Sequence, residues 1–570
     1  MAVEATVAPL PDEEWDDADF DITIDPTLLQ DDFYRDQEEE SCSSGEEEGL
    51  DDDPPCDYTE DLRDKSDLKV LRESQARAAY EQSSILGLFH LFLTKSWFSA
   101  MKQWTNQKLA SKGKKKISQE QFMAYIGLEV AMSFVKLNQV KDYWTDKMFI
   151  QQKDFQSVMS RNLFQDIRGS VMLHDPDMYD HNIASADPLH HSRNLLGHFL
   201  RNSAKVAVPV GTSALDENSA RTKARCAAVT FNAEKPDKFA IRFYCVVSTA
   251  HTYVHSMMDN RSGNKTQQTA PEAYCQLFSE LRQPYNNCIA NSSNSEVKAD
   301  SASAGWVLQM AHQTKIYQDP NHKRVIFCDN FYTRHTLATS LKKITDGEAR
   351  LVGTCRFNNV DATNRFYLKQ AIEELKDKPR GSWVLVRAYD KVDNYDALKR
   401  QHTNQQNRLP KNQRTPFVPP MTSIAEKAGF VVLKDAKVVV FYTNDLKATP
   451  TAPTLAMDSE EAIHAVNGTC IIRRWTGSEV MHRSSLEVPA IVGAYNSFMN
   501  AVDRMDQIRS SCPTRHREKR VSMTLFTLIL DLPILHMNSK DSTSGNMIWH
   551  EYPIPCHVVQ PRVLFCLLSF

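Results

Sequence analysis

Helical spacing of apolar residues begins near residue 80 of the chain. In SWFSAMKQWTNQKLA the apolar side chains recur on one helix face. The next segment, SQEQFMAYIGLEVAMSFVKL, opens with Ser118 and Gln121 in the spacing of a capping box and then keeps its apolar residues on one side. A third segment, 155–172, has the same spacing. We therefore predict an all-α region over residues 80–206.

The apolar period falls to two residues after 207, which indicates strands. RCAAVTF, KFAIRFYCVV and TYVHSM are three strand candidates in close succession, and three antiparallel neighbours are their simplest arrangement. Residues 261–304 are rich in Ser, Asn and Gln, with one short helix predicted at EAYCQLFSELR. We expect a surface excursion there.

The run RVIFCD, which ends at Asp329, is short and continuously apolar, as is typical of a strand buried on both faces. TRHTLATSLKK follows it with helical spacing. Because a strand followed by a helix implies a crossover connection, we expect this strand to have a parallel neighbour.

Residues 358–480 are polar and rich in loops, and they interrupt the α/β pattern. They contain a strand at SWVLVRAY and a hairpin at GFVVLKDAKVVVFYT that turns at Lys434 and Asp435. Helical spacing resumes at AYNSFMNAVDRMDQIRSS and continues through 521–537. The run MTLFTLILDLPIL falls short of the ~20 residues that a membrane helix needs, so we expect a core helix.

Charge divides the chain into an acidic start and a basic body. Residues 1–64 hold 25 Asp and Glu against two arginines, a net charge of −23, whereas the remaining residues carry a net charge of +18. A segment this acidic cannot bury enough apolar surface to offset chain entropy, so we predict that residues 1–75 are disordered. It serves either as a solubilising tail or as an arm that competes with nucleic acid for the basic body, which suits a polyanionic partner.

The twelve cysteines include no CxxC pair, and no apolar signal segment follows the first Met. Both features favour a reduced, intracellular protein.

Four aspartates occupy positions suited to a metal site. Asp216 lies in SALDENSA just before the first strand group, and Asp329 ends a buried strand. Asp503 and Asp506 lie three residues apart on one helix face, where like charges repel unless a cation lies between them. Carboxylate oxygens favour Mg²⁺ or Mn²⁺, and two such ions can promote attack on a phosphodiester. Because Asp is also a common turn and capping residue, spacing alone leaves both interpretations open.

Taken in order, these motifs resemble those of the piggyBac-type transposases over most of residues 85–540. LGLFHLFLTKSWFSAMKQWTN, FMAYIGLEVAMSFVKLNQVKDYWTD and MSRNLFQDIRGSVMLHD are similar to the helical start of that family. The three acidic motifs are matched by Asp216 and Glu217 ahead of Lys235 and Pro236, by Asp329 with Asn330, Phe331 and Tyr332, and by Tyr495, Asn496, Val502, Asp503 and Asp506.

The resemblance implies a multidomain α/β protein with a ribonuclease-H-like core, in which Asp216 and Asp329 lie on neighbouring strands and a helix brings in Asp503. It implies that these three aspartates are catalytic and bind Mg²⁺ (or Mn²⁺), with Asp506 as an additional candidate ligand. The implied chemistry is nicking at the element's end, hairpin formation by the freed 3′-hydroxyl, and joining to a TTAA target. The implied partners are terminal-repeat DNA, target DNA and a second copy in a homodimer, with a nuclear location and no membrane.

The domain boundaries implied by these motifs divide the chain into six parts. They are a disordered acidic segment at 1–75, a helical dimerisation and DNA-binding domain at 80–206, the first part of the core at 207–357, an insertion domain at 358–480, the second part of the core at 481–540, and an irregular tail at 541–570.

Basic residues gather at two places that we predict to contact DNA. The first is the loop after the first predicted helix, with Lys114, Lys115 and Lys116, where a solvated turn is the alternative. The second is the helix that carries Asp503 and the segment after it, where a solvated helix end or a nuclear import signal at RHREKR is the alternative. Its members are Arg504, Arg509, Arg515, Arg517, Lys519 and Arg520.

The chain departs from the family pattern at the third acidic motif, after Asp216 and at the C-terminus. Asn500 and Ala501 stand where the family usually has two glycines, and NSARTKAR replaces the usual apolar residues after Asp216 and Glu217. Family members commonly end in a Cys-rich zinc module, whereas this tail has no familiar finger spacing. Its potential ligands are His550, Cys556, His557 and Cys566.

Two hypotheses therefore remain open from the sequence. The retained aspartates favour an active transposase, and the altered motif and tail favour a decayed or domesticated copy that binds DNA or chromatin without cutting it. A general ribonuclease-H-like nuclease is a third hypothesis, but it does not account for the long helical region at 80–206.

Overall fold

The computed structural model describes residues 56–538 except for internal gaps. These gaps are 65–67, 134, 136, 138, 148–149, 179–186, 234–237, 260–269, 291–304, 308, 311–323, 391, 393, 421, 476–482 and 512–517. The predictions for residues 1–55, for Lys235 and Pro236, for Arg515 and Arg517, and for the tail at 541–570 lie outside the described residues.

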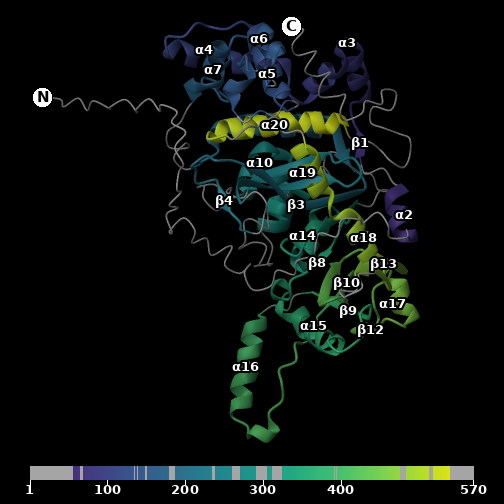
Figure 1. Ribbon diagram of the computed structural model, residues 1–570. Coiled ribbons are helices and arrows are strands. Elements are labelled where there is room, and N and C mark those ends of the chain that lie inside the picture. The colour runs from purple at the N-terminus through teal and green to yellow at the C-terminus, as the bar shows by residue number, and fades with distance from the viewer. Residues whose placement is uncertain are drawn as a thin grey trace, which may run out of the picture. The chain divides into compact units, whose positions relative to one another are not determined.

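A mixed sheet of ten strands forms the centre of the fold (Figure 1). Its order is β12-β9-β10-β11-β8-β7-β3-β5-β4, and β6 also pairs with β5. The pairs β3–β7 and β7–β8 are parallel, and the other pairs are antiparallel. The strands are β3 (Thr212–Arg221), β4 (Thr230–Phe231), β5 (Phe239–Ser248), β6 (Val254–Asp259), β7 (Arg324–Cys328), β8 (Ala349–Thr354), β9 (Trp383–Tyr389), β10 (Ile424–Lys434), β11 (Val438–Thr443) and β12 (Thr454–Ala456).

The apolar run that ends at Asp329 behaves as predicted. All five residues of β7 are buried, and the strand lies between two parallel neighbours, β3 and β8. The predicted helix follows as α14 (His335–Ile344). A strand with neighbours on both edges and packed on both faces needs apolar side chains throughout, which explains why its sequence does not alternate.

Asp216 lies inside a strand, so the prediction that it precedes the first strand group was wrong. β3 carries small polar side chains in buried positions, including Thr212, Ser213 and Asn218, and this hides the apolar period. RCAAVTF forms only the two-residue β4, whereas KFAIRFYCVV and TYVHSM correspond to β5 and β6, and these three pair in antiparallel fashion as predicted.

The helical region predicted from residue 80 is confirmed in its elements. Ser118 caps its helix as predicted, because its hydroxyl accepts the amide of Gln121 and the Gln121 side chain accepts the amide of Ser118. The segment 155–172 forms two helices instead of one, since Ser160 starts a new helix by accepting the amide of Leu163. The helices are α3 (Glu73–Phe92), α4 (Lys95–Ser111), α5 (Gln119–Ala131), α6 (Lys153–Val158), α7 (Arg161–Arg168) and α9 (His190–Val206).

The end of the acidic segment is structured, which corrects the predicted disorder for residues 57–64 and 68–75. Asp57–Asp64 form α2, and Leu68–Val70 form β1, which pairs with β2 (Ala207–Pro209). Tyr58 and Leu62, four residues apart, are buried, and the Tyr58 hydroxyl donates a hydrogen bond of 2.8 Å to Asp445. Two apolar side chains on one helix face are enough to dock α2 despite its charge.

The segment 358–480 joins the central sheet. Its strands β9, β10 and β11 extend the sheet because β11 pairs with β8, and the hairpin between β10 and β11 turns where it was predicted. Outside the sheet, β13 (Thr469–Trp475) and β14 (Arg483–Pro489) form a separate hairpin. The segment also contains α15 (Ala362–Leu375), α16 (Tyr395–Asn407), which buries no side chain, and α17 (Glu460–Ala465).

Three helices complete the part of the chain that the structure describes after β14. The predicted continuous helix is two, α18 (Ala490–Phe498) and α19 (Ala501–Ser511), and the buried Ala501 begins the second. The apolar run at 521–537 forms the core helix α20 (Val521–Asn538), which packs against α3, α9 and β3 (Figure 1). Over the described ranges, no helix combines the length and apolar character that crossing a membrane requires.

Candidate active site

Two of the predicted aspartates start from adjacent backbone positions. β3 and β7 are parallel neighbours with Leu215 opposite Cys328, and the next residue on each strand is Asp216 and Asp329. Neighbouring strands lie about 4.8 Å apart, so the two carboxylates leave the sheet side by side. The buried strand can end on a charged residue because Asp329 is only half-buried and its carboxylate accepts a backbone amide.

Local hydrogen bonds orient both side chains. The Asp216 carboxylate accepts the amide of Glu217 at 2.7 Å, and the Asp329 carboxylate accepts the amide of Phe331 at 2.8 Å. The second bond makes an Asx turn, which leads the chain from β7 toward α14. The Thr333 hydroxyl donates to the Asp329 carbonyl at 2.8 Å and fixes the other side of the same turn.

The pKa shifts of two neighbouring tyrosines indicate a concentration of negative charge around Asp216 and Asp329. Burial, together with the charges of Glu217, Asp216 and Asp329, holds the pKa of Tyr332 well above its usual range. Burial and the charge of Asp329 likewise raise the pKa of Tyr495. A pair of carboxylates whose field reaches the buried phenol of Tyr332 and the half-buried phenol of Tyr495 is an environment that favours a bound cation.

The third acidic motif reaches the same place through α18. Tyr495 lies within hydrogen-bonding distance of the Thr354 hydroxyl on β8, at 3.2 Å, and the ring of Phe498 lies 5.2 Å from that of Phe327 on β7. The spacing of the motif alone did not indicate that its tyrosine would contact the strand next to Asp329.

α19 packs against β3, the strand that carries Asp216. Asp506 accepts a hydrogen bond of 3.2 Å from the Asn218 side chain and another from Arg509, which also donates to the Ser219 carbonyl at 2.8 Å. Asp503, one turn earlier, is exposed. The structure therefore ties Asp506 to Asn218 on β3, whereas the Asp503 side chain is exposed to solvent.

The residues present satisfy part of what a divalent metal ion requires. Asp216 and Asp329 supply hard oxygen donors of the kind that Mg²⁺ and Mn²⁺ prefer. Within the described ranges, however, no three His, Cys, Asp or Glu side chains are grouped closely enough to hold a metal ion. The site as described is a pair of carboxylates with the third acidic motif beside it.

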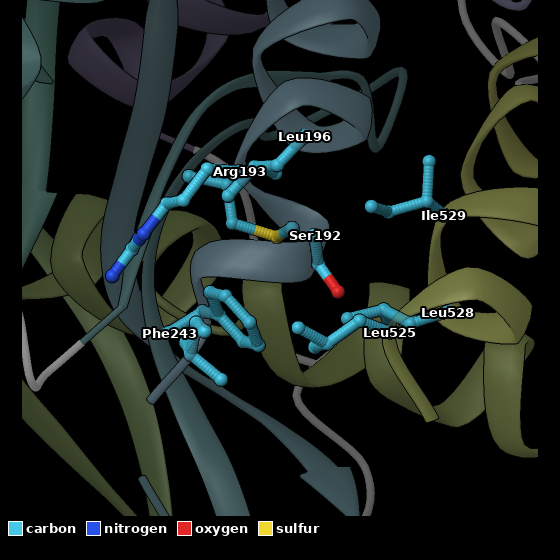
Figure 2. A pocket seen from close by; sticks show the side chains of 9 residues that line it. Ser192, Arg193, Leu196, Phe243, Leu525, Leu528 and Ile529 are labelled. Carbon is cyan, nitrogen blue, oxygen red and sulfur yellow. The ribbon is translucent and has the colours of Figure 1, made fainter. Parts of the chain in front are cut away.

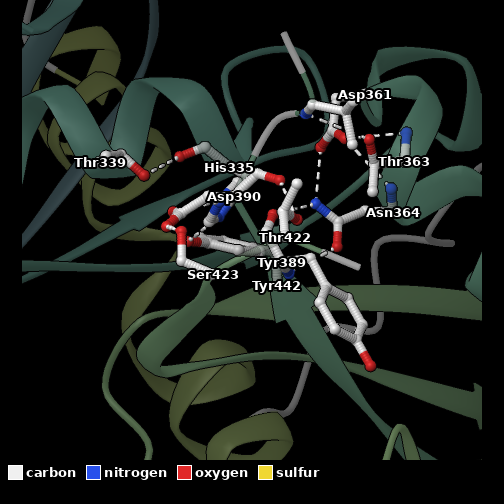
Figure 3. Close-up of polar contacts among 11 residues, drawn as sticks. His335, Thr339, Asp361, Thr363, Asn364, Tyr389, Asp390, Thr422, Ser423 and Tyr442 are labelled. Atoms are coloured by element: carbon white, nitrogen blue, oxygen red, sulfur yellow. Dashed lines mark hydrogen bonds and ion pairs between the residues drawn. The ribbon is translucent and has the colours of Figure 1, made fainter. Parts of the chain in front are cut away.

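A polar network fixes the helix that follows Asp329 to the segment 358–480 (Figure 3). His335, the first residue of α14, lies 2.9 Å from the Tyr442 hydroxyl on β11 through Nδ1 and 4.0 Å from Asp390 through Nε2. The Ser423 hydroxyl donates to the other oxygen of Asp390 at 2.5 Å. Side chains far apart in sequence thus hold the turn that presents Asp329, and no sequence signal marked them.

One described end of the second basic cluster, at Arg520, lies near the lysine loop. Lys114, Lys115 and Lys116 are exposed, and Lys114 forms an ion pair of 3.2 Å with Asp166. Burial lowers the pKa of Lys112, and the charges of Lys108 and Arg520 lower it further. Lysines of the loop after α4 and basic residues just before α20 therefore share one region of the surface, where Lys519 is exposed and Arg520 is half-buried.

The other described arginines of the second cluster are engaged within the protein. Arg504 donates a hydrogen bond to the Thr249 carbonyl, and Arg509 is 4% exposed and bonded as described above. Their contacts to β3 and its neighbourhood position α19.

A buried ion cluster anchors the chain just before α20. Arg168, at the end of α7, donates to Glu129 at 2.8 Å and to Glu518. The Glu129 and Glu518 side chains are 0% and 5% exposed, and burial raises the pKa of Glu518. The cluster joins α5, α7 and the segment that carries Lys519 and Arg520.

Neither of two hollows in the structure contains the aspartates. A cavity of about 10 Å³ lies between α9, the sheet and α20, and Figure 2 shows the apolar side chains of Leu196, Phe243 and Ile529 around it. That volume is at the lower limit for a single water molecule. A more open groove of about 370 Å³ is lined by residues of 280–287 and 343–346.

Comparison with known proteins identifies the family. A family model described as Transposase IS4 matches residues 85–405, more than half of the chain, and the chain belongs to that family. The cryo-EM structure of the piggyBac transposase synaptic complex with hairpin DNA has a similar fold, with a TM-score of 0.56 at 15% sequence identity over 86% of this chain and 82% of that chain. The search of curated proteins found no match. The resemblance drawn from the motifs is confirmed.

Proposed function

We propose that the protein is a metal-dependent DNA transposase that cuts and joins phosphodiester bonds. The observation that carries this proposal is the placement of Asp216, inside β3, beside Asp329, which directly follows the parallel strand β7, in a chain of a transposase family. The proposal includes a ribonuclease-H-like core, which the mixed sheet around β3 and β7 supports.

In this proposal Asp216 and Asp329 bind Mg²⁺ or Mn²⁺, and Asp503 supplies the third carboxylate from the first turn of α19. The ion would lower the pKa of an attacking hydroxyl and stabilise the leaving oxygen. The amides of Glu217 and Phe331 orient the two carboxylates for this role. Asp506 acts as a positioning residue, since it holds α19 to Asn218 on β3.

The finer steps of the proposed function are extended to this chain from the similar transposase structure and from the family. The similar solved structure is of a synaptic complex with hairpin DNA, which supports a hairpin step for this chain, and we extend the family's TTAA target preference to it. We propose that the exposed lysines 114–116 and Lys519 contact the DNA backbone, where neutralised phosphates release counterions. Action as a homodimer in the nucleus completes the proposal.

A plasmid assay tests the cutting step. Purified protein and Mg²⁺ or Mn²⁺ are incubated with a supercoiled plasmid that carries the flanking terminal repeats. We expect nicked and linear products with the natural chain and none with Asp329→Asn or Asp216→Asn. Asp396→Asn is the matched control, because this aspartate is exposed on α16, which buries no side chain.

A second candidate function is DNA binding without cleavage. It is favoured by the bonding of Asp506 to Asn218 and Arg509 and by the lack of a three-ligand group in the described ranges. Tight, salt-dependent binding of the same plasmid by the natural chain, with no product under either metal, would establish this function and overturn the first.

A further inference from the structure

Two cysteines that are distant in sequence lie where α2, α18 and β13 meet. Cys56 immediately precedes α2, and Cys470 is the second residue of β13. α18 contacts both α2 and β13, which lie near one another in Figure 1. Both cysteines are thiols in the structure, Cys56 partly exposed and Cys470 only 8% exposed.

The Cys56 sulfur sits at a helix N-terminus among hydrogen-bond donors. Its Sγ lies 2.7 Å from the Thr59 hydroxyl, and the amides of Tyr58 and Thr59 also hydrogen-bond it. The largest effect is a hydrogen bond from the Cys470 side chain, and together these contacts lower the pKa of Cys56 to about 5 despite its burial. Cys56 is therefore a thiolate at neutral pH, the form that reacts with oxidants.

Cys470 is held close to this thiolate by the packing of α18. Its Sγ lies 3.8 Å from the Pro489 carbonyl oxygen. Its sulfur also lies against the backbone of Gly493, where an added Cβ would stand only 2.5 Å from Sγ. The side chain thus has little room to move away from Cys56, as is needed for a thiol that captures an oxidised neighbour.

We propose that Cys56 and Cys470 form a redox-sensitive pair that a hydroperoxide converts to a disulfide. The Cys56 thiolate attacks one peroxide oxygen, the O–O bond breaks, and a sulfenic acid and one water result. The Cys470 sulfur then displaces the hydroxyl of that sulfenic acid, which leaves as a second water while the S–S bond forms. The two thiols lose two electrons and two protons, and the peroxide gains them.

This modification goes beyond the proposed cutting activity and does not depend on it. The bond would join α2, at the end of the acidic segment, to β13 beside α18. Because α18 leads directly into the helix that carries Asp503, oxidation acts on the support of the third acidic motif.

Mass spectrometry of the full chain tests the proposal. Reduced protein is treated with one equivalent of hydrogen peroxide, alkylated with N-ethylmaleimide and digested without reductant. We expect a peptide pair linked through Cys56 and Cys470. Cys226→Ser is the matched control, since Cys226 is also partly exposed, and it should leave this product unchanged.

Two single variants separate the steps. With Cys470→Ser, peroxide should yield no linked peptide, and dimedone should label Cys56 as the sulfenic acid. With Cys56→Ser, neither the link nor a dimedone adduct at Cys470 should form. The pH midpoint for alkylation of Cys56 by iodoacetamide should lie near 5 in the natural chain and shift upward in Cys470→Ala, which removes the hydrogen-bond donor.

Three outcomes would overturn the proposal. They are a natural chain in which peroxide leaves Cys56 unmodified, one in which Cys56 bonds to a different cysteine or to a second chain, and an alkylation midpoint that Cys470→Ala does not move.

Discussion

Replacing Arg168 with leucine is the sharpest test of how the helical region is fixed to α20. Arg168 is the cation between two carboxylates, at 2.8 Å from Glu129 and in direct contact with Glu518. Leucine fills much of the same volume but carries no charge. The variant therefore leaves both carboxylates in place, with 0% and 5% of their side chains exposed and their partner removed.

The size of the expected loss of stability follows from the burial of the two glutamate side chains. Breaking a buried ion pair by removing one partner costs about 3–5 kcal/mol, and here two carboxylates lose the same partner. Burial already raises the pKa of Glu518, so without Arg168 the Glu518 carboxyl takes up a proton at higher pH. Protonation removes the buried charge, and we therefore expect the loss of stability to be larger at pH 8 than at pH 5.5.

Urea denaturation of the full chain at these two pH values measures the change. The matched control is Arg77→Leu, because Arg77 pairs with Glu73 at 3.7 Å while both side chains are largely exposed. A surface pair of this kind contributes about 0–1 kcal/mol. A loss of stability in Arg168→Leu no larger than that in Arg77→Leu, or a loss that is equal at both pH values, would contradict this prediction.

Three further predictions concern β8, α20 and the lysine loop. Gly353→Ala should abolish plasmid cleavage and lower the melting temperature, because the new Cβ would stand 2.3 Å from the Cys328 carbonyl and displace the end of β7. Burial lowers the pKa of the His536 imidazole to about 3. As pH falls, the imidazole therefore takes up a proton in the unfolded chain before it does so in the folded chain. The free energy of unfolding should then fall by about 1.4 kcal/mol per pH unit below about pH 6.5. His536→Gln, which can still accept the Val254 amide, should flatten this acid limb in melts at several pH values. Replacing lysines 114–116 by glutamine should reduce the slope of log K against log salt by up to about 3 in DNA binding, and an unchanged slope would exclude these phosphate contacts.

The sequence predicts some elements well for identifiable reasons. β7 could be predicted because it is buried on both faces and so is apolar throughout, and Ser118 because a capping box is a local pattern. The strand of Asp216 could not, because its buried positions hold small polar residues such as Asn218. Residues 57–64 looked too acidic to fold, yet Tyr58 finds an apolar site formed by residues hundreds of positions away.

The candidate site, too, was predicted from the sequence only in part. Asp216, Asp329 and Asp503 were predicted from their motifs, and the pairing of β3 with β7 brings the first two together. Their catalytic roles stay a prediction. The contacts that support the site, such as His335 with Tyr442 and Arg168 with Glu518, join segments with no sequence pattern in common. Only the folded chain reveals them.

The continuity of the central sheet has a consequence for shortened versions of the protein. β8 is hydrogen-bonded to β7 on one side and to β11 on the other, and β11 belongs to the segment 358–480. Excising that segment to isolate a minimal core would strip β8 of its partner and leave a row of bare amide and carbonyl groups. Such an edge recruits strands from other molecules, so the truncated chain should aggregate and would need a new covering for that edge to remain in solution.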